Sequence, residues 1–170
     1  APAANLIKTD EEYALAIETA LGAAAQNIVV ESQNAGKQAI ELLKRMDAGR
    51  ATFLPLDTIK GRLLQDAPVN DPGYLGTAYE LCRFEERFGN IFAELLGRTV
   101  IAETLSDAVR MAKRSGNRLR IVTLDGQLIS PGGSMTGGSA AKGSGILSRA
   151  NELEKLKKQR LSLAEKEKDC

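Results

Sequence analysis

Apolar residues recur at every fourth position near the start of the chain, which is the spacing of one face of an amphipathic helix. The residues with this spacing are Tyr13, Ile17 and Leu21. Thr9 and Glu12 have the types and the spacing of a capping box at the start of this helix. Gly22 predicts its end, because glycine tolerates the left-handed conformation that closes many helices.

A run of β-branched residues comes next at 27–31 and predicts a buried strand. Residues 35–45 predict a second helix, and residues 50–57 predict a second strand that ends in a turn at Asp57. The first part of the chain therefore predicts the order helix, strand, helix, strand.

The same order recurs in the second half of the chain. A shift of 75 residues places the first predicted helix on a second copy. The matching pairs are Leu6 and Leu81, Lys8 and Arg83, Asp10-Glu11 and Glu85-Glu86, Tyr13 and Phe88, Ile17 and Phe92, Leu21 and Leu96, and Gly22 and Gly97. Residues 99–103, 105–114 and 118–125 continue the copy as strand, helix and strand. Any small α/β protein can give such patterns, but the matching glycines, acid pairs and final aspartates favour a duplicated unit.

The two copies differ in the segments that succeed them along the chain. A polar stretch with proline and glycine, residues 66–73, indicates a linker after the first copy. After the second copy, Asp125-Gly126 lies between two strand-like runs and predicts a tight hairpin. We predict a first subdomain over 1–66, a linker over 67–75, a second subdomain with a glycine-rich motif over 76–147, and the start of a coiled-coil arm over 148–170.

Residues 131–139 read Pro-Gly-Gly-Ser-Met-Thr-Gly-Gly-Ser. This region has neither the spacing of a P-loop nor that of a dinucleotide-binding fingerprint, and the Ser-x-x-Lys that begins at Ser139 is too isolated to indicate a penicillin-binding enzyme. Met135 and Thr136 give the segment a strand-like centre between glycine pairs. The pattern predicts an exposed sheet edge that pairs with another chain, and a flexible loop is the alternative.

The last twenty residues, 151–170, contain no glycine, proline or β-branched residue. Leu153, Leu156 and Leu163 share one helical stripe, which Arg160 interrupts. Because fewer than three heptads are present, a coiled coil and a solvated amphipathic helix both remain open.

Composition narrows the possible functions. The chain has no histidine and two cysteines, which excludes a Ser-His-Asp triad, a His-ligated metal site and a disulfide framework. Cys82 lies among apolar residues, so we expect a small buried side chain and a reducing compartment. No apolar run reaches the ~20 residues of a membrane span, and no signal peptide is visible. Because the chain begins with alanine and ends inside a helical pattern, we expect a piece of a longer protein.

Charge adds one candidate surface. The formal net charge is +1, so a polyanionic partner would have to be recognised locally. Five basic residues fall close together without an acid between them: Arg110, Lys113, Arg114, Arg118 and Arg120. They are candidates for contacts to DNA phosphates, and a solvated helix face is the alternative. The acid pairs at 10–11 and 85–86 fall in first helical turns, where they favour the positive end of the helix dipole, so we predict a structural role for them.

Four segments together resemble the hinge domain of structural-maintenance-of-chromosomes (SMC) proteins, and bacterial members in particular. They are residues 25–31, residues 49–57, the Arg-Ile-Val-Thr-Leu-Asp-Gly at 120–126, and the Pro-Gly-Gly-Ser-Met-Thr-Gly-Gly at 131–138, here called the glycine motif. The resemblance covers about residues 4–165. An eight-residue glycine motif in the right order with the other blocks is highly specific.

The resemblance implies an α+β hinge fold, in which two pseudo-repeated helix–strand–helix–strand subdomains are followed by a coiled-coil helix. It implies a homodimer that joins two coiled-coil arms into a ring or a V, with each contact setting one half of a hinge against the other half of its partner. The interface residues that it implies are Gly132, Gly133, Ser134, Met135, Thr136, Gly137 and Gly138, with Gly76 on the facing edge. It implies no catalytic or metal-binding residue and no cofactor for this domain, because ATP and Mg²⁺ belong to a head domain elsewhere in such proteins.

The resemblance also implies chromosome condensation and segregation at the nucleoid in the cytoplasm, away from membranes, with accessory subunits bound elsewhere. Weak, non-specific DNA contact is expected from the five basic residues and Lys142. Some bacterial members have several lysines after the glycine motif, where this chain has Lys142 alone, and the incoming coiled-coil arm is absent before Ala1. A stand-alone nucleic-acid-binding module is the alternative function, whereas a phosphate-binding enzyme is disfavoured by the missing histidine and P-loop.

Overall fold

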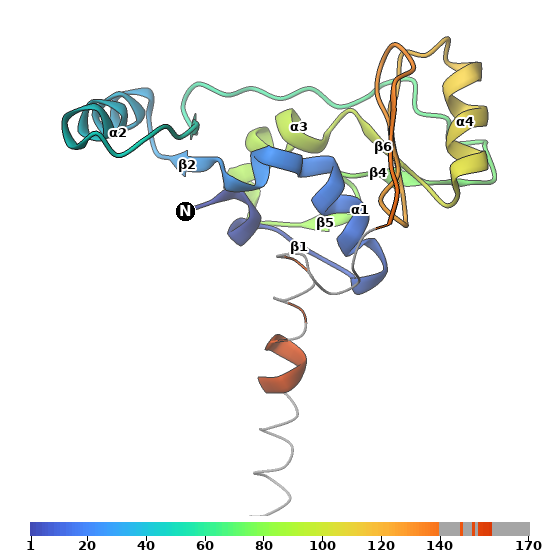
Figure 1. Cartoon of the computed structure of the whole chain (residues 1–170), viewed down its shortest axis with the longest axis horizontal. Coiled ribbons are helices and arrows are strands. Elements are labelled where there is room, and N and C mark those ends of the chain that lie inside the picture. The colour runs from blue at the N-terminus through green and yellow to red at the C-terminus, as the bar shows by residue number, and fades with distance from the viewer. Residues whose placement is uncertain (140–146, 148–150, 152, 158–170) are drawn as a thin grey trace, which may run out of the picture.

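A computed structural model of the chain describes residues 1–139, 147, 151 and 153–157 (Figure 1). The helices are α1 (Glu11–Leu21), α2 (Gln33–Met46), α3 (Gly89–Leu96) and α4 (Leu105–Arg114), with 3-10 turns at η1 (Ala3–Leu6), η2 (Gly22–Gln26) and η3 (Glu86–Phe88). The strands are β1 (Lys8–Thr9), β2 (Ile28–Val30), β3 (Phe53–Pro55), β4 (Tyr74–Thr77), β5 (Cys82–Arg83), β6 (Thr99–Ala102), β7 (Arg120–Thr123), β8 (Leu128–Ile129) and β9 (Met135–Thr136). Residues 147, 151 and 153–157 are also helical.

Two copies of a helix–strand–helix–strand unit organise the fold, as the repeat in the sequence predicts. The first unit is α1, β2, α2 and β3, and the second unit is α3, β6, α4 and β7. The two strands of each unit are parallel and have the same register, because Ile28 faces Phe53 just as Val100 faces Ile121. The predicted α+β fold is therefore confirmed, and the aligned positions of the paired strands are structurally equivalent.

The helix between the two strands begins in the same way in both units. The hydroxyl of Ser32 accepts a hydrogen bond from the backbone N–H of Ala35 at 3.0 Å. The hydroxyl of Thr104 accepts one from the N–H of Asp107 at 3.2 Å. These N-caps fix where α2 and α4 start and align the two helices residue by residue.

Helix α1 begins differently from the prediction. Its N-cap is Asp10, where no side chain makes a capping hydrogen bond. Thr9 belongs to β1 instead, and its hydroxyl donates to the carbonyl oxygen of Leu81 at 2.7 Å. The predicted capping box of Thr9 and Glu12 is therefore wrong, because a tertiary partner takes the hydroxyl.

The two units meet around a short antiparallel pair of strands, β1 and β5. Lys8 faces Arg83 there, so equivalent positions of the repeat lie opposite each other, as an approximate two-fold axis requires. Helices α1 and α3 pack together beside this pair, and their Ile17, Ile91 and Phe92 side chains are fully buried. The central core is thus shared between the two units.

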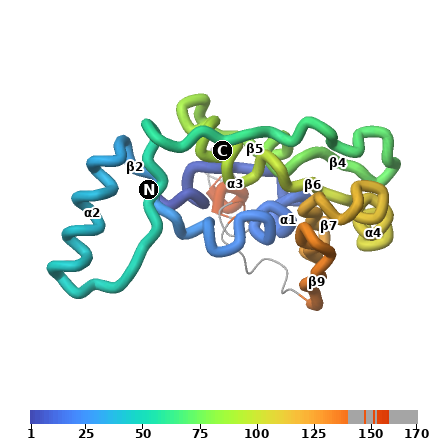
Figure 2. The backbone as a smooth tube through the Cα atoms, turned by 90° about the horizontal axis from the view of Figure 1, so that it is seen from above, coloured from blue at the N-terminus to red at the C-terminus, as the bar shows by residue number. Residues whose placement is uncertain are grey.

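The second unit carries the largest sheet, with the strand order β4-β6-β7-β8-β9. Strands β6 and β7 are parallel, and the other neighbours are antiparallel. The predicted hairpin is confirmed as the β7–β8 connection, where Gly126 has a φ of +83°. Helix α4 packs against this sheet, and α2 and α4 lie at opposite ends of the molecule (Figure 1 and Figure 2).

An irregular connection leads from β3 to β4 and spans residues 56–73. The predicted linker, residues 67–75, lies mainly within it, but its last two residues belong to β4. The difference arises because Tyr74 pairs with Ala102 in the sheet, which a polar sequence pattern does not reveal. The division into subdomains stays a prediction, and most of the predicted coiled-coil arm, including Arg160 and Leu163, lies outside the described residues.

Candidate functional site

The glycine motif contains the outermost strand of the five-stranded sheet. This strand, β9, pairs with β8 on one side, and in the described part of the chain no strand pairs with its other side. Both of its residues are exposed, and Met135 is 58% exposed. The strand-like centre that the sequence predicts is therefore an open sheet edge in a single copy of the protein.

The backbone groups of Met135 point away from β8. The N–H of Ser130 donates to the carbonyl oxygen of Ser134 at 2.8 Å, so these two residues form a hydrogen-bonded pair. Bonded and non-bonded pairs alternate along an antiparallel ladder, which makes Ile129 and Met135 a non-bonded pair. The N–H and C=O of Met135 are consequently available to a further strand.

Gly132 and Gly133 form the turn between β8 and β9, with φ angles of +94° and +100° that disfavour any side chain. The N–H of Gly132 donates to Asn117 O at 2.8 Å, and that of Gly133 to Ser130 O at 2.9 Å. These hydrogen bonds define a specific turn, so the structure does not support the flexible-loop alternative for this part of the motif.

Gln127 holds the far end of β9. Its Nε2 donates to Gly138 O at 2.9 Å, and its Oε1 accepts from the N–H of Gly138 at 2.8 Å. A Cβ atom at Gly137 would collide with the Gln127 side chain, and Gly138 has a φ of +142°. Each of the four glycines thus has a role within one protomer, and their predicted contact with a partner stays a prediction. No sequence motif pointed to Gln127.

The first unit presents a second open edge. Strand β3 pairs with β2, and no other strand of the described residues pairs with it. Thr52 and Leu56 make hydrogen bonds of 2.9 Å to β2, so the alternation of a parallel pair points the N–H and C=O of Phe53 outward. Helix α2, beside this edge, exposes three large apolar side chains: Ile40, Leu42 and Met46.

Gly76 lies in β4, at the opposite edge of the five-stranded sheet from β9. It is buried in its own protomer and has a φ of +143°, next to a register shift in the β4–β6 pairing. A Cβ atom there would approach the side chains of Glu80 and Leu81 to 3.3 Å. The structure therefore explains this glycine within one protomer, and its predicted interface role stays a prediction.

The structure separates the predicted DNA-binding residues. Arg110 is held by Asp71, with its Nε 3.0 Å from Oδ2 and its Nη2 2.6 Å from Oδ1. Hydrogen bonding to Arg110 lowers the pKa of Asp71 to about 2, so this guanidinium belongs to a closed ion-pair cluster. Lys113 and Arg114 are exposed in the last turn of α4. Lys142 lies outside the described residues.

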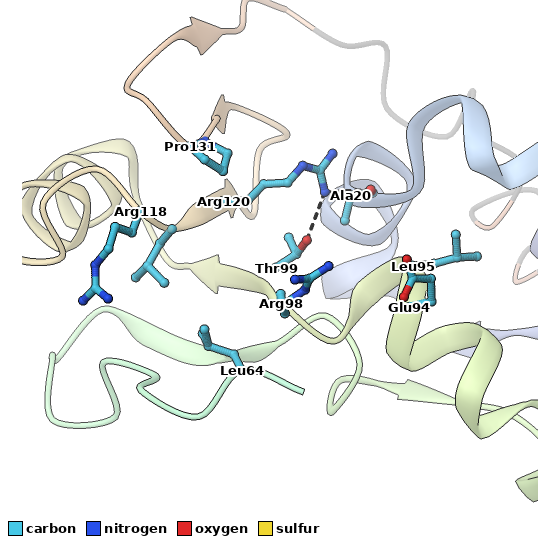
Figure 3. Close-up of a pocket in the computed structure, with 10 residues that line it drawn as sticks. Ala20, Leu64, Glu94, Leu95, Arg98, Thr99, Arg118, Arg120 and Pro131 are labelled. Carbon is cyan, nitrogen blue, oxygen red and sulfur yellow. Dashed lines mark hydrogen bonds between the residues drawn. The ribbon is translucent and has the colours of Figure 1, made fainter. Parts of the chain in front are cut away.

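Three arginines gather around a cavity of about 460 Å³ (Figure 3). Arg120 comes from β7, Arg118 from the loop before it, and Arg98 from the loop between α3 and β6. The Nη1 of Arg120 donates to Ala20 O at 2.8 Å and to Thr99 Oγ1 at 3.0 Å, which ties the end of α1 to the sheet of the second unit. Sequence reasoning named Arg118 and Arg120 but missed Arg98, which is distant from them in the chain.

The two acid pairs lie at helix starts. Asp10 is the N-cap of α1 and pairs with Arg83 at 3.0 Å, whereas Glu85 and Glu86 begin the 3-10 turn η3 instead of an α-helix. Within the described residues, no group of three or more His, Cys, Asp and Glu side chains could hold a metal ion. None of the helices described here is long and apolar enough to cross a membrane.

Cys82 is half-buried and packs against the central core, where the sequence predicts a small buried side chain. Burial raises the pKa of its thiol to about 12. The reactive thiolate is therefore scarcely populated at neutral pH, and the side chain acts as a small apolar group.

Comparison with known sequences shows the family to which the chain belongs. The family model of the flexible hinge domain of SMC proteins matches residues 1–112. The chromosome partition protein Smc of Desulfitobacterium hafniense (strain Y51) is 45% identical over 159 residues, which are 92% of this chain and 13% of that protein. The chain thus corresponds to a small part of this relative's length.

Two solved structures share the fold. The SMC hinge domain of Geobacillus stearothermophilus, an asymmetric dimer, has a TM-score of 0.88 and 44% identity over 98% of this chain and 69% of that chain. The Pyrococcus furiosus Smc hinge domain with an extended coiled coil has a TM-score of 0.71 and 34% identity over 97% of this chain and 59% of that chain. Both similarities extend over nearly the whole chain.

Proposed function

Because the chain belongs to the family of SMC flexible hinge domains, we propose that it is the homodimerisation hinge of a chromosome partition protein. Two copies join through their open sheet edges and connect two coiled-coil arms into a ring- or V-shaped dimer. The chain spans 13% of the Desulfitobacterium relative, so ATP hydrolysis, with ATP and Mg²⁺ at a head domain, belongs in this proposal to other parts of the protein. Chromosome condensation and segregation at the nucleoid are likewise proposed for the whole protein.

One observation carries this proposal: the open edges at β9 and at β3 cannot meet within one copy. Strand β9 offers the backbone groups of Met135, and β3 offers those of Phe53. Strand β9 lies toward the α4 end of the molecule, whereas β2, the partner of β3, lies toward the α2 end (Figure 2). A second copy can bring its β9 beside β3 of the first and cover the exposed Ile40 and Met46.

A two-fold axis makes this contact twice. If β9 of one copy lies beside β3 of the other, the rotation places the second β9 beside the first β3. Each contact then joins the second unit of one copy to the first unit of the other. Because β9 and β3 of both copies become paired with each other, this contact closes on itself and does not continue into a chain of molecules.

The outgoing helix is docked against the same body. Lys8 in β1 pairs with Glu154 at 2.9 Å, and the Nδ2 of Asn151 donates to Thr9 O at 3.3 Å. Leu153 and Leu156 remain exposed on the described part of this helix. Their exposure supports a coiled coil with a second helix, which would transmit the orientation of the hinge to the arm.

Sedimentation equilibrium of two matched variants tests the proposal. We expect the wild-type chain to have about twice its mass of 18.2 kDa at tens of micromolar. Met135→Pro removes the outward N–H, a position where an edge strand tolerates proline, and should give a folded monomer by circular dichroism. Met135→Ala keeps the N–H and should stay dimeric. A dimeric Met135→Pro variant would exclude β9 as the contact, and a monomeric wild-type chain would contradict the proposal as a whole.

We also propose that the domain has no ATPase activity of its own. The acid pairs at 10–11 and 85–86 lie at helix starts, and Asp10 and Glu85 pair with Arg83 and Arg87. Purified domain should therefore release no phosphate from ATP. Turnover that the Glu86→Gln variant abolishes would contradict this.

A further inference from the structure

Strand β4 forms the edge of the five-stranded sheet opposite β9, and in the described part of the chain no strand pairs with its outer side. Figure 2 shows β4 and β9 on opposite sides of β6 and β7. Unpaired backbone groups at such an edge are a template for pairing with another chain. The contact between β9 and β3 in the proposed dimer leaves β4 uncovered, so a free β4 would let dimers join one another.

The register of the β4–β6 pair shows which backbone groups of β4 face outward. The N–H of Ala78 donates to Thr99 O at 2.8 Å, so these two residues form a hydrogen-bonded pair. Thr77 and Val100, the neighbouring residues of the antiparallel ladder, are therefore a non-bonded pair. The N–H and C=O of Thr77 consequently point away from β6, as those of Met135 point away from β8.

Both outward groups of Thr77 are used within the protomer, whereas those of Met135 and Phe53 are available to a partner. The C=O of Thr77 accepts a hydrogen bond from the N–H of Leu81 at 3.2 Å, and its N–H donates to Glu80 Oε2 at 3.5 Å. The Thr77 hydroxyl accepts from the N–H of Glu80 at 3.2 Å, which holds this turn in place. The chain thus folds back over its own strand edge, where a partner strand would otherwise bind.

The carboxylate of Glu80 also places a charge along this edge. Glu80 is exposed, and its Oε2 lies 3.3 Å from the position that a Cβ atom of Gly76 would occupy. Burial, and after it the negative charge of Glu80, raise the pKa of Tyr74, so the carboxylate lies near this residue of β4 as well. A strand that approached β4 would have to displace or desolvate the carboxylate, and charged side chains protect edge strands in this way.

The linker closes the other end of β4. The N–H of Glu103 donates to Gly73 O at 2.9 Å, so Tyr74 and Ala102, the next residues of the ladder, are a non-bonded pair. The outward N–H of Tyr74 donates to Asp71 O at 3.1 Å. The outward N–H groups of β4 at both of these positions are therefore satisfied within one protomer.

We propose that Thr77 and Glu80 close β4 and thereby determine which sheet edges of the hinge can join. With β4 closed, β9 and β3 are the edges that pair, and assembly stops at the two-fold dimer. With β4 open, each dimer would present two further edges, one on each copy, and pairing of β4 with β4 of another dimer would build a growing chain. The inference rests on the proposed function, because it concerns what limits the dimer. It gives Gly76 a role within one protomer, which is to leave room for Glu80.

Sedimentation equilibrium of a variant that carries Thr77→Val and Glu80→Ala tests the proposal. Valine keeps the β-branched shape of the buried Thr77 but lacks its hydroxyl, and alanine removes the carboxylate. We expect a folded protein whose mass rises with concentration to roughly twice that of the dimer or more. Glu80→Ala alone should associate in the same direction but more weakly. The matched control Glu103→Ala removes an equal charge from an exposed position beside β6 and should stay dimeric.

Amide exchange at Thr77 separates closure of the edge from a purely structural role. In the double variant this amide should exchange faster than in the wild type in dilute solution and become protected as the larger assemblies form. A variant that stays dimeric while its residue 77 amide exchanges rapidly would overturn the proposal, as would equal association of Glu103→Ala. If the double variant does not fold, the same two measurements on Glu80→Ala decide.

The wild-type chain in the same experiment distinguishes a failure of this inference from a failure of the hinge. A monomeric wild type would contradict the proposed dimer. Association of the double variant from that monomer would still support closure of β4, because the newly opened edge would be its cause. A dimeric wild type with a double variant that does not associate further would overturn the closure of β4 and leave the hinge dimer intact.

Discussion

The two repeated units have the same elements in the same register, yet they bury very different shares of their residues. Strands β6 and β7 of the second unit are buried along nearly their whole length, whereas β2 and β3 of the first bury only their central residues, Val29 and Leu54. Helix α4 buries Ala108, Met111 and Ala112, but α2 buries Gly36 alone. In the second unit the strands and α4 are therefore packed together and largely buried, whereas in the first unit the strands and α2 remain largely exposed.

The difference comes from the strands that flank each unit. In the second unit, β8 pairs with β7 and its Ile129 packs in the same core as α4. In the first unit, the described chain supplies no strand on the side of β3 that faces away from β2. In the proposed dimer, the β8–β9 hairpin of the other copy supplies the strand that the first unit lacks, so the open edge of the first unit serves association.

Equivalent substitutions in α2 and α4, the helices between the two strands of each unit, should differ in whether they affect the fold or the dimer. Ala112 is 4% exposed and Ile40, eight residues after its own N-cap as Ala112 is after Thr104, is 48% exposed. Ala112→Glu buries an unpaired charge and should destabilise the fold by about 3–5 kcal/mol, seen as a lower urea midpoint. Ile40→Glu should leave the fold within ~0.5 kcal/mol but abolish the dimer in sedimentation.

The pair of variants also carries its own control. Ile40→Leu keeps an apolar side chain of the same size and should stay dimeric. If Ile40→Glu remained dimeric, or if both charged variants unfolded alike, the first unit would not depend on a partner more than the second does.

A second expected difference concerns an acid-sensitive cluster that the second unit has and the first lacks. Arg110 joins Asp71 to Asp107, whereas the equivalent positions of α2 are Gln38 and Ala35. The pKa of Asp71 is lowered from 3.8 to about 2, mainly by hydrogen bonds from Arg110, so its stabilising effect is present above about pH 4 and is lost as pH falls toward 2.

Asp71→Asn should therefore lower the free energy of unfolding at neutral pH, and the gap to the wild type should narrow between about pH 4 and pH 2. Urea unfolding at a series of pH values measures this gap. A gap that stays constant with pH would mean that the charge of Asp71 does not contribute.

The smallest expected effect lies at the two N-caps. Ser32→Ala and Thr104→Ala should each cost about 1 kcal/mol of helix stability. In the second unit this loss should appear in global unfolding, because α4 is packed into the sheet. In the first unit, when Ser32→Ala is combined with a variant that keeps the protein monomeric, the loss of helix stability should appear mainly as faster amide exchange within α2. Equal effects on global unfolding would indicate that α2 is as well integrated as α4.

Patterns in the sequence predicted the parts of the fold that depend on local order. The sequence predicted helix α4 and the turn at Gly126 where they occur, because the spacing of apolar residues and the residue types of a turn depend on neighbours along the chain. The family that the resemblance named is confirmed by the family model, which matches residues 1–112, and by the Smc relative, whose similarity covers 92% of the chain. The strand-like centre at Met135 and Thr136 was also expected. Which of its backbone N–H and C=O groups point away from β8 depends on the register of the β8–β9 pair, which the sequence pattern does not give.

Side-chain partners between distant segments could not be predicted in this way. The Thr9 hydroxyl donates a hydrogen bond to the carbonyl oxygen of Leu81, so this tertiary contact replaces the capping hydrogen bond that the local pattern predicts. Arg110 was expected on a free basic surface, but Asp71 meets it from another segment. Arg98 joins Arg118 only through the folding of β6 beside β7. Each case depends on which strands become neighbours, which the sequence period does not specify.

Hydrogen exchange at two backbone amides tests most directly whether β9 of one copy completes the first unit of another. In a monomer the N–H groups of Phe53 and Met135 point to solvent, and in the proposed dimer a strand from the partner protects them. We expect both amides to become protected together as protein concentration rises through the dimer dissociation constant, and both to exchange rapidly in a monomeric variant such as Ile40→Glu. A dimer in which either amide continues to exchange at the monomer rate would contradict the account.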